Sequence, residues 1–232
     1  MEQPERSYEV NVIGTLGMLE AARAEGVERF VFAASSAAYG DSEACPKRED
    51  MAPRPLSPYA SGKLAGEHLL AVWGRTYGMH TVALRYFNVF GPRQADGSPY
   101  SGVIAIFATR LLSGKQVTIH GDGRQTRDFC YVDNVVCANL AAMEASDLEP
   151  GVVFNVGTGE RVSLLELYEE TARIVGSGAR PEHGPARAGD VRHSQASIDR
   201  IRGALGFVPG TGWREGLGRT VSWYRERLAT AT

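Results

Sequence analysis

The sequence predicts an α/β protein built around an open parallel sheet. Short strands of the apolar, buried kind are expected over 27–34 and 81–87, with a helix over 57–77 between them. This order of strand, helix and strand is typical of βαβ units, whose two strands pair in parallel. Such sheets bind ligands beyond the C-terminal ends of their strands, so Ser35 and Asn88 are expected beside a binding site.

The composition argues against several classes of function. The chain has 232 residues, of which 43% are hydrophobic and 22% charged, and its net charge is −2. This charge gives no electrostatic reason to expect nucleic acid or an anionic membrane as a partner. No apolar run is long enough to span a bilayer, and the first residues do not form a signal peptide. The three cysteines and five histidines show no metal-binding spacing, which favours reduced thiols, no bound metal and a cytoplasmic location.

A helix is expected before the first strand, over 7–25, and Gly26 ends it. Its expected apolar positions are Val10, Leu16, Leu19 and Ala22. The segment 40–56 contains three prolines and is expected to form an irregular loop.

The helix over 57–77 carries a candidate catalytic pair. Ser57 is a suitable N-cap and Gly78 a suitable stop. Tyr59 and Lys63 lie one turn apart on this helix, and an ammonium beside a phenol favours the phenolate that a general base requires. Ser35 could offer a hydroxyl to the same reacting oxygen. The alternative interpretation is that both residues lie on a solvated helix face.

The second half of the chain predicts a lobe of small elements that folds over a ligand. Helices are expected over 103–113, 133–145, 163–175, 197–205 and 213–229, and strands over 117–120 and 152–156. Arg127 and Arg192 lie in glycine-rich loops, and guanidinium groups bind phosphate with two parallel hydrogen bonds. These two arginines therefore predict a diphosphate site, with solvated surface arginines as the alternative.

Six stretches together resemble one protein family. They are NVIGT at 11–15, SSAAYG at 35–40, SPYASGK at 57–63, RYFNVFGPRQ at 85–94, GDGRQTRDF at 121–129 and RAGDVR at 187–192. In this order and spacing they resemble the extended short-chain dehydrogenase/reductases of the NAD-dependent epimerase/dehydratase family, and the UDP-sugar 4-epimerases in particular.

The resemblance implies a Rossmann-type parallel sheet and a smaller α/β substrate-binding lobe. Residues 1–94 would belong to the NAD-binding domain and residues 95–232 mainly to the nucleotide-sugar lobe, with some later segments returning to the sheet. It further implies NAD as cofactor, a UDP-sugar as substrate and, for a full-length protein, a homodimer.

The resemblance also assigns catalytic and cofactor roles. Tyr59 would be the acid and base, Lys63 would support it and hold the nicotinamide ribose, and Ser35 would bridge to the sugar hydroxyl. Tyr86 and Phe87 would lie at the nicotinamide end of the site.

The resemblance also assigns residues to the three parts of the UDP-sugar substrate. Asn88, Arg127 and Arg192 would contact the diphosphate, and the uridine would lie against Thr118, Ile119 and His120. Ser194 would lie beside the sugar 2-substituent. In the resembled epimerases a tyrosine at this position accompanies activity on plain hexoses, whereas a small residue admits N-acetylated hexoses.

Two departures from the family pattern matter. Ser36 and Ala37 stand where the family's 4,6-dehydratases have an Asp-Glu pair, so epimerisation fits better than a dehydratase or a reductase. No glycine-rich turn for a dinucleotide pyrophosphate is present, and about three βαβ units, on the order of 90 residues, would be missing.

The chain is therefore expected to be an N-terminally truncated member of the family, with a buried-type strand left as an exposed edge. The alternative to an active epimerase is a truncated fragment that binds nucleotide sugar without catalysis.

Overall fold

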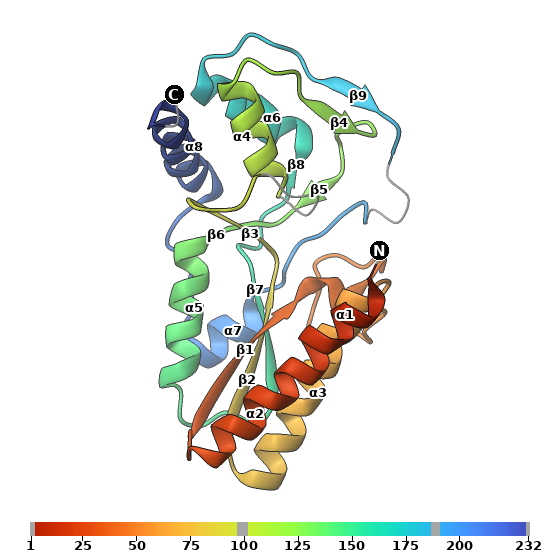
Figure 1. Cartoon of the computed structure of the whole chain (residues 1–232), viewed down its shortest axis with the longest axis vertical. Coiled ribbons are helices and arrows are strands. Elements are labelled where there is room, and N and C mark those ends of the chain that lie inside the picture. Colours follow the sequence, from red (N-terminus) through yellow and green to blue (C-terminus); the bar gives the residue numbers. More distant parts are fainter. Residues whose placement is uncertain (1–2, 97–101, 187–190, 231–232) are drawn as a thin grey trace.

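The computed structural model describes residues 3–96, 102–186 and 191–230. The chain forms two parts, a sheet with helices on both faces and a smaller lobe stacked on one end of it (Figure 1). The first four residues of the RAGDVR stretch lie outside the described residues.

The central sheet is parallel and has the strand order β1-β2-β7. Its strands are β1 (Arg29–Ser35), β2 (His80–Tyr86) and β7 (Val152–Val156). Strand β7 comes from the second half of the chain and returns to pair with β2. Within the described residues β1 pairs only with β2, and Ala33 in β1 is exposed. The expected exposed strand edge is therefore confirmed.

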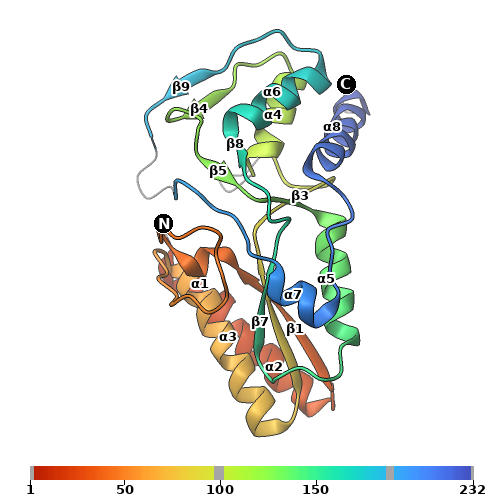
Figure 2. The same cartoon turned by 180° about the vertical axis from the view of Figure 1, so that it is seen from behind.

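Helices cover both faces of this sheet, as the two opposite views show (Figures 1 and 2). One face carries α1 (Pro4–Tyr8), the π-helical turn Glu9–Ile13, α2 (Gly14–Ala24) and α3 (Pro58–Tyr77). The other face carries α5 (Val132–Glu144) and α7 (Asp199–Leu205). Leu19 and Leu70 pack against Phe32 on the first face, whereas Val135 and Ile201 belong to the cluster on the second.

The N-terminal helix departs from the sequence prediction in two ways. It begins at Pro4, and Val10, an expected core position, is 60% exposed. A π turn interrupts the helix here, and in it the Gly14 N–H donates to the Glu9 carbonyl five residues earlier. At about 100° per residue Val10 and Leu19 point to opposite faces of a helix, so Leu19 is buried as expected while Val10 is not.

Helix α3 follows its sequence signals closely. The Ser57 Oγ accepts the Ala60 N–H at 3.1 Å, and Gly78 ends the helix in the left-handed conformation with φ 73°. Between β1 and α3 the chain forms a short 3₁₀ helix (Ser36–Tyr39) and then the expected irregular loop. The first strand begins at Arg29 rather than at Val27.

The smaller lobe contains three helices and three two-stranded sheets among its described residues. The helices are α4 (Val103–Leu112), α6 (Leu164–Val175) and α8 (Trp213–Thr230). The strands are β3 (Asn88–Phe90), β4 (Thr118–His120), β5 (Thr126–Arg127), β6 (Phe129–Tyr131), β8 (Val162–Ser163) and β9 (Glu182–Gly184). They pair as β3-β6, β4-β9 and β5-β8. Phe107, Leu167 and Leu217 lie in the lobe's own core.

Across the three described ranges, no helix has both the length and the apolar character needed to cross a membrane.

Candidate functional site

Two adjoining cavities lie where the sheet meets the smaller lobe. One of about 470 Å³, here called the sheet-side cavity, is lined by Ser35, Tyr86, Phe87 and Ser194 among others. The other, of about 450 Å³, is called the lobe-side cavity and lies between α4 and β4. Asn88 and Arg127 line both cavities, so a ligand long enough to fill the two would pass between these residues.

Ser35 places a hydroxyl at the C-terminal end of β1. The residue is 9% exposed, and its Oγ accepts the Ala37 N–H at 3.2 Å as the cap of the 3₁₀ helix. Because that contact uses the oxygen only as an acceptor, the hydroxyl proton can be donated to a ligand in the cavity.

Tyr59 and Lys63 lie on α3 as the sequence predicts. The Lys63 Nζ is 5.9 Å from the centroid of the Tyr59 ring and 5.0 Å from that of the Phe32 ring. Burial lowers the pKa of Lys63. Tyr59 is 46% exposed and does not line either cavity, although Ser57 and Ala60 on the same helical turn line the sheet-side cavity. The structure thus places the phenol at the edge of this cavity rather than in its wall.

The surroundings of Lys63 fit the nicotinamide end of a dinucleotide. Among the described residues its half-buried ammonium makes no hydrogen bond or ion pair and lies near two aromatic rings. An ammonium has three donors that need acceptors, and ribose hydroxyls are acceptors of the right kind. In the described ranges no glycine-rich turn leads directly from a strand into a helix, so the fit concerns this end of the cofactor alone.

Tyr86 and Phe87 form one wall of the sheet-side cavity. The Tyr86 hydroxyl donates to Asn139 Oδ1 at 3.0 Å, and burial raises the pKa of Tyr86. Phe87 is 4% exposed. A hydrogen bond and burial therefore hold these two side chains in the cavity wall, and their contact with the nicotinamide stays a prediction.

Tyr39 is a lining residue that the sequence reasoning missed. Its hydroxyl donates to Asn155 Oδ1 at 2.6 Å, and the Arg85 guanidinium lies 4.7 Å from its ring centroid. Burial raises the pKa of Tyr39. The signal that could have found it is the Tyr-Gly pair that ends the SSAAYG stretch.

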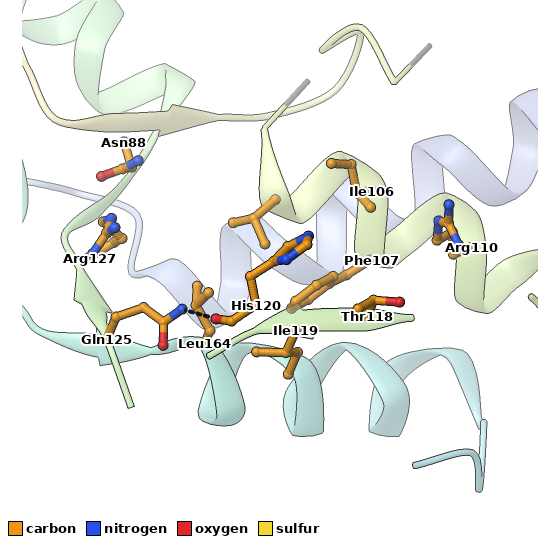
Figure 3. Close-up of a pocket in the computed structure, with 11 residues that line it drawn as sticks. Asn88, Ile106, Phe107, Arg110, Thr118, Ile119, His120, Gln125, Arg127 and Leu164 are labelled. Carbon is orange, nitrogen blue, oxygen red and sulfur yellow. Dashed lines mark hydrogen bonds between the residues drawn. The ribbon is translucent and has the colours of Figure 1, made fainter. Parts of the chain in front are cut away.

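The lobe-side cavity gathers the residues expected to contact uridine. Thr118, Ile119 and His120 line it from β4, and the Gln125 Nε2 donates to the His120 carbonyl at 2.7 Å (Figure 3). Helix α4 adds Phe107 and Arg110 on the opposite side, and neither was predicted from the sequence. An aromatic ring and a guanidinium suit a flat base.

Arg127 and Asn88 line both cavities, and Figure 3 shows their side chains among those that line the lobe-side cavity. The Arg127 Nη1 donates to the Thr126 carbonyl at 2.8 Å, which orients the guanidinium along β5.

The next residue, Asp128, is fully buried and holds three segments together. It accepts hydrogen bonds from the N–H groups of Thr158, Gly159 and Ala196 and from the Thr158 hydroxyl, at 2.7–3.1 Å. Burial nevertheless raises the pKa of Asp128. This carboxylate therefore fixes the strand that carries Arg127.

Arg192 is another predicted site residue that the structure does not bring into either cavity, as is also the case for Tyr59 and Lys63. Its side chain is 66% exposed and lies 3.2 Å from Asp122 Oδ2 in an ion pair. Ser194, two residues later, does line the sheet-side cavity, and its N–H donates to the Thr126 carbonyl at 3.1 Å.

Two further features describe which ionisable and metal-ligating groups surround the site. Ser36 and Ala37 line the sheet-side cavity, so no carboxylate stands next to Ser35 in the sequence. Within the described part of the chain, no three metal-ligating side chains come together.

Comparisons with known proteins identify the family of the chain. The model of the NAD dependent epimerase/dehydratase family matches residues 1–157. The chain is 40% identical over 228 residues to the UDP-glucose 4-epimerase of Mycolicibacterium smegmatis. This alignment covers 98% of this chain and 72% of the relative.

Two solved structures are similar over nearly the whole chain. The Thermotoga maritima UDP-glucose 4-epimerase with UDP-glucose has a TM-score of 0.92 at 40% identity. The match covers 97% of this chain and 72% of the Thermotoga maritima chain. The Thermus thermophilus UDP-glucose 4-epimerase complex with NAD has a TM-score of 0.84 at 40% identity. The match covers 94% of this chain and 70% of the Thermus thermophilus chain. The chain therefore belongs to the NAD-dependent epimerase/dehydratase family.

Proposed function

We propose that this chain carries the catalytic site of a UDP-sugar 4-epimerase that acts on UDP-glucose or UDP-N-acetylglucosamine. The observation that carries the proposal is the junction at Asn88 and Arg127 between a cavity suited to a base and a cavity beside Ser35. A nucleotide sugar has this layout, with its diphosphate between the base and the hexose.

The chain's own residues would move one proton during the reaction. Tyr59 would take the proton of the sugar 4-hydroxyl and later return it, while the Lys63 ammonium stabilises the phenolate. Ser35 would hydrogen-bond the same oxygen and so fix carbon 4 in the cavity. Tyr86 and Phe87 would exclude water from the reacting face.

Lys63, Ser35 and Phe87 would hold the nicotinamide end of NAD. When bound, NAD would supply the hydride chemistry at carbon 4 of the sugar. The lining by Ser36 and Ala37 supports epimerisation over dehydration, because elimination of water requires a second acid–base pair.

The test is an NMR assay of the purified chain with saturating NAD and UDP-glucose, in which we expect UDP-galactose to form. UDP binding without turnover at any NAD concentration would favour the alternative of a non-catalytic nucleotide-sugar binder. A homodimer remains a prediction from the family resemblance, and light scattering of the same sample would test it.

A further inference from the structure

Asn155 is a fully buried asparagine on β7, which pairs only with β2 among the described residues. It lines neither of the two cavities, and the proposed function gives it no role. A carboxamide is costly to bury unless its donors and its acceptor are paired. The partners of this side chain therefore indicate what it does in the structure.

The carboxamide of Asn155 joins three segments that are distant in sequence. Its Oδ1 accepts a hydrogen bond from the Tyr39 hydroxyl at 2.6 Å. Its Nδ2 donates to the Lys47 carbonyl at 2.9 Å and to the Ser197 carbonyl at 3.2 Å. Both amide hydrogens and the amide oxygen are thus used, each toward a segment outside the central sheet.

Two of these segments are also bonded to each other. The Lys47 N–H donates to the Gln195 carbonyl at 2.7 Å, and the Ser197 N–H donates to the Lys47 carbonyl at 2.8 Å. Glu49, two residues after Lys47, accepts the main-chain N–H of Asn155 through its Oε1 at 2.8 Å. The two segments therefore form one unit along the outer edge of β7.

All three segments contribute to the wall of the sheet-side cavity. Tyr39 and Lys47 line it, and so does Ser194, three residues before Ser197. None of these three lining residues belongs to the lobe-side cavity. A change at Asn155 would therefore act on the sheet-side cavity, although Asn155 itself does not touch a ligand there.

We infer that Asn155 is a positioning residue for the hexose, because it holds together the three segments that shape the sheet-side cavity. The inference rests on the proposed function, which takes the hexose to lie in this cavity. It predicts that the hydrogen bonds of Asn155 support binding of the sugar and leave binding of the nucleotide diphosphate alone.

The experiment measures the affinities of the purified chain for UDP and for UDP-glucose by calorimetry. Asn155→Leu keeps a similar volume but makes no hydrogen bond, so we expect UDP-glucose to bind at least about tenfold weaker and UDP to stay within about twofold of the wild type. Tyr39→Phe removes only one of the contacts and should weaken UDP-glucose binding by roughly threefold.

Hydrogen exchange of the ligand-free chain tests the same contacts without any nucleotide. In both variants the amides over 38–49 and 195–197 should exchange at least about fivefold faster, while those of α6 should keep their rates. Tyr168→Phe is the matched control for the affinities and should change neither, since this buried tyrosine donates to the Ala179 carbonyl at 2.9 Å and lines neither of the two cavities.

Each result bears on either the inference or the proposed function. Unchanged UDP-glucose affinity in a folded Asn155→Leu, or an equal loss for UDP and UDP-glucose, would overturn the inference. If Asn155→Leu does not fold, Tyr39→Phe decides by the same comparison. A wild-type chain that does not bind UDP would contradict the proposed function instead, and unchanged exchange over 38–49 and 195–197 would then still overturn the inference.

Discussion

Glu67 and Arg85 form a buried, bidentate ion pair that joins helix α3 to strand β2. The Arg85 Nε lies 2.8 Å from Glu67 Oε1 and the Nη2 lies 2.7 Å from Oε2, and both side chains are at most 5% exposed. Glu67 follows Lys63 by one helical turn. The ion pair therefore fixes the helix of Tyr59 and Lys63 against the sheet that carries Ser35.

Breaking this ion pair should destabilise the fold strongly. Glu67→Gln leaves the Arg85 charge buried without a counter-charge, which typically costs about 3–5 kcal/mol of unfolding free energy. Urea denaturation would measure the loss. Arg48→Gln is the matched control, because Arg48 and Asp50 form an exposed pair, and we expect no measurable change there. A loss below about 1 kcal/mol in Glu67→Gln would show that the pair does not hold α3 in place.

Removing the proposed base should abolish turnover without affecting nucleotide binding. Tyr59→Phe deletes one hydroxyl on the half-exposed side of α3, so UDP affinity should stay unchanged. The rate of sugar epimerisation at saturating NAD should fall by roughly 10²–10⁴-fold, as expected for loss of an acid–base group. A variant that retains more than about a hundredth of the wild-type rate would rule out Tyr59 as the base.

The two arginines predicted from the sequence should differ in their effect on UDP binding. Arg127→Ala should weaken UDP binding by roughly 1.5–3 kcal/mol, because Arg127 lines both cavities. Arg192→Ala should have a smaller effect, since Arg192 is exposed and paired with Asp122. Calorimetric titration of both variants provides the comparison. Equal affinities of wild-type and Arg127→Ala would argue against a diphosphate between the cavities.

Elements with local signals could be predicted from the sequence. Ser57 and Gly78 mark the ends of α3 because a cap and a left-handed stop act within one helical turn. Ser163 begins α6 with a complete capping box, and β7 has the predicted bounds. The positions of Ser35 and Asn88 beside the site follow from the βαβ order alone.

Features set by distant contacts could not be predicted. The π turn over Glu9–Ile13 has no local signature, and the return of β7 to β2 depends on pairing across the whole lobe. Tyr39 and Lys47 reach the sheet-side cavity because contacts with Asn155 hold them there, more than 100 residues away in sequence. Sequence motifs therefore identify the candidate catalytic side chains but not all of the residues that line the cavity.

The cysteines should differ in reactivity. Burial raises the pKa of Cys130 to about 12 from an ordinary 9.0, whereas Cys137 is exposed. At pH 8 iodoacetamide should modify Cys137 in the native chain and Cys130 only in urea, as peptide mapping would show. Because the folded pKa is raised, the neutral Cys130 thiol contributes stability that is present below pH 9 and lost as the pH rises toward 12. Rapid native labelling of Cys130 would contradict its burial.

Ser194 offers a test of which sugar the cavity admits. It lines the sheet-side cavity, and the contact of its N–H with the Thr126 carbonyl fixes its main chain. The family resemblance expects this position beside the sugar 2-substituent, where a serine leaves space and a hydroxyl for an acetamido group. The alternative is that Ser194 only supports the segment that leads to α7.

Ser194→Tyr should fill that space with a phenol ring. We expect it to remove turnover of UDP-N-acetylglucosamine while sparing UDP-glucose, because forcing a bulky group into an occupied space costs roughly 1–3 kcal/mol or more. Rates for both sugars at saturating NAD would give the comparison, and Ser194→Ala would separate the effect of volume from that of the hydroxyl. If Ser194→Tyr lost both activities equally, the residue would be structural. A phenol ring that only blocks the space for the acetamido group cannot impair turnover of UDP-glucose, because UDP-glucose lacks that group.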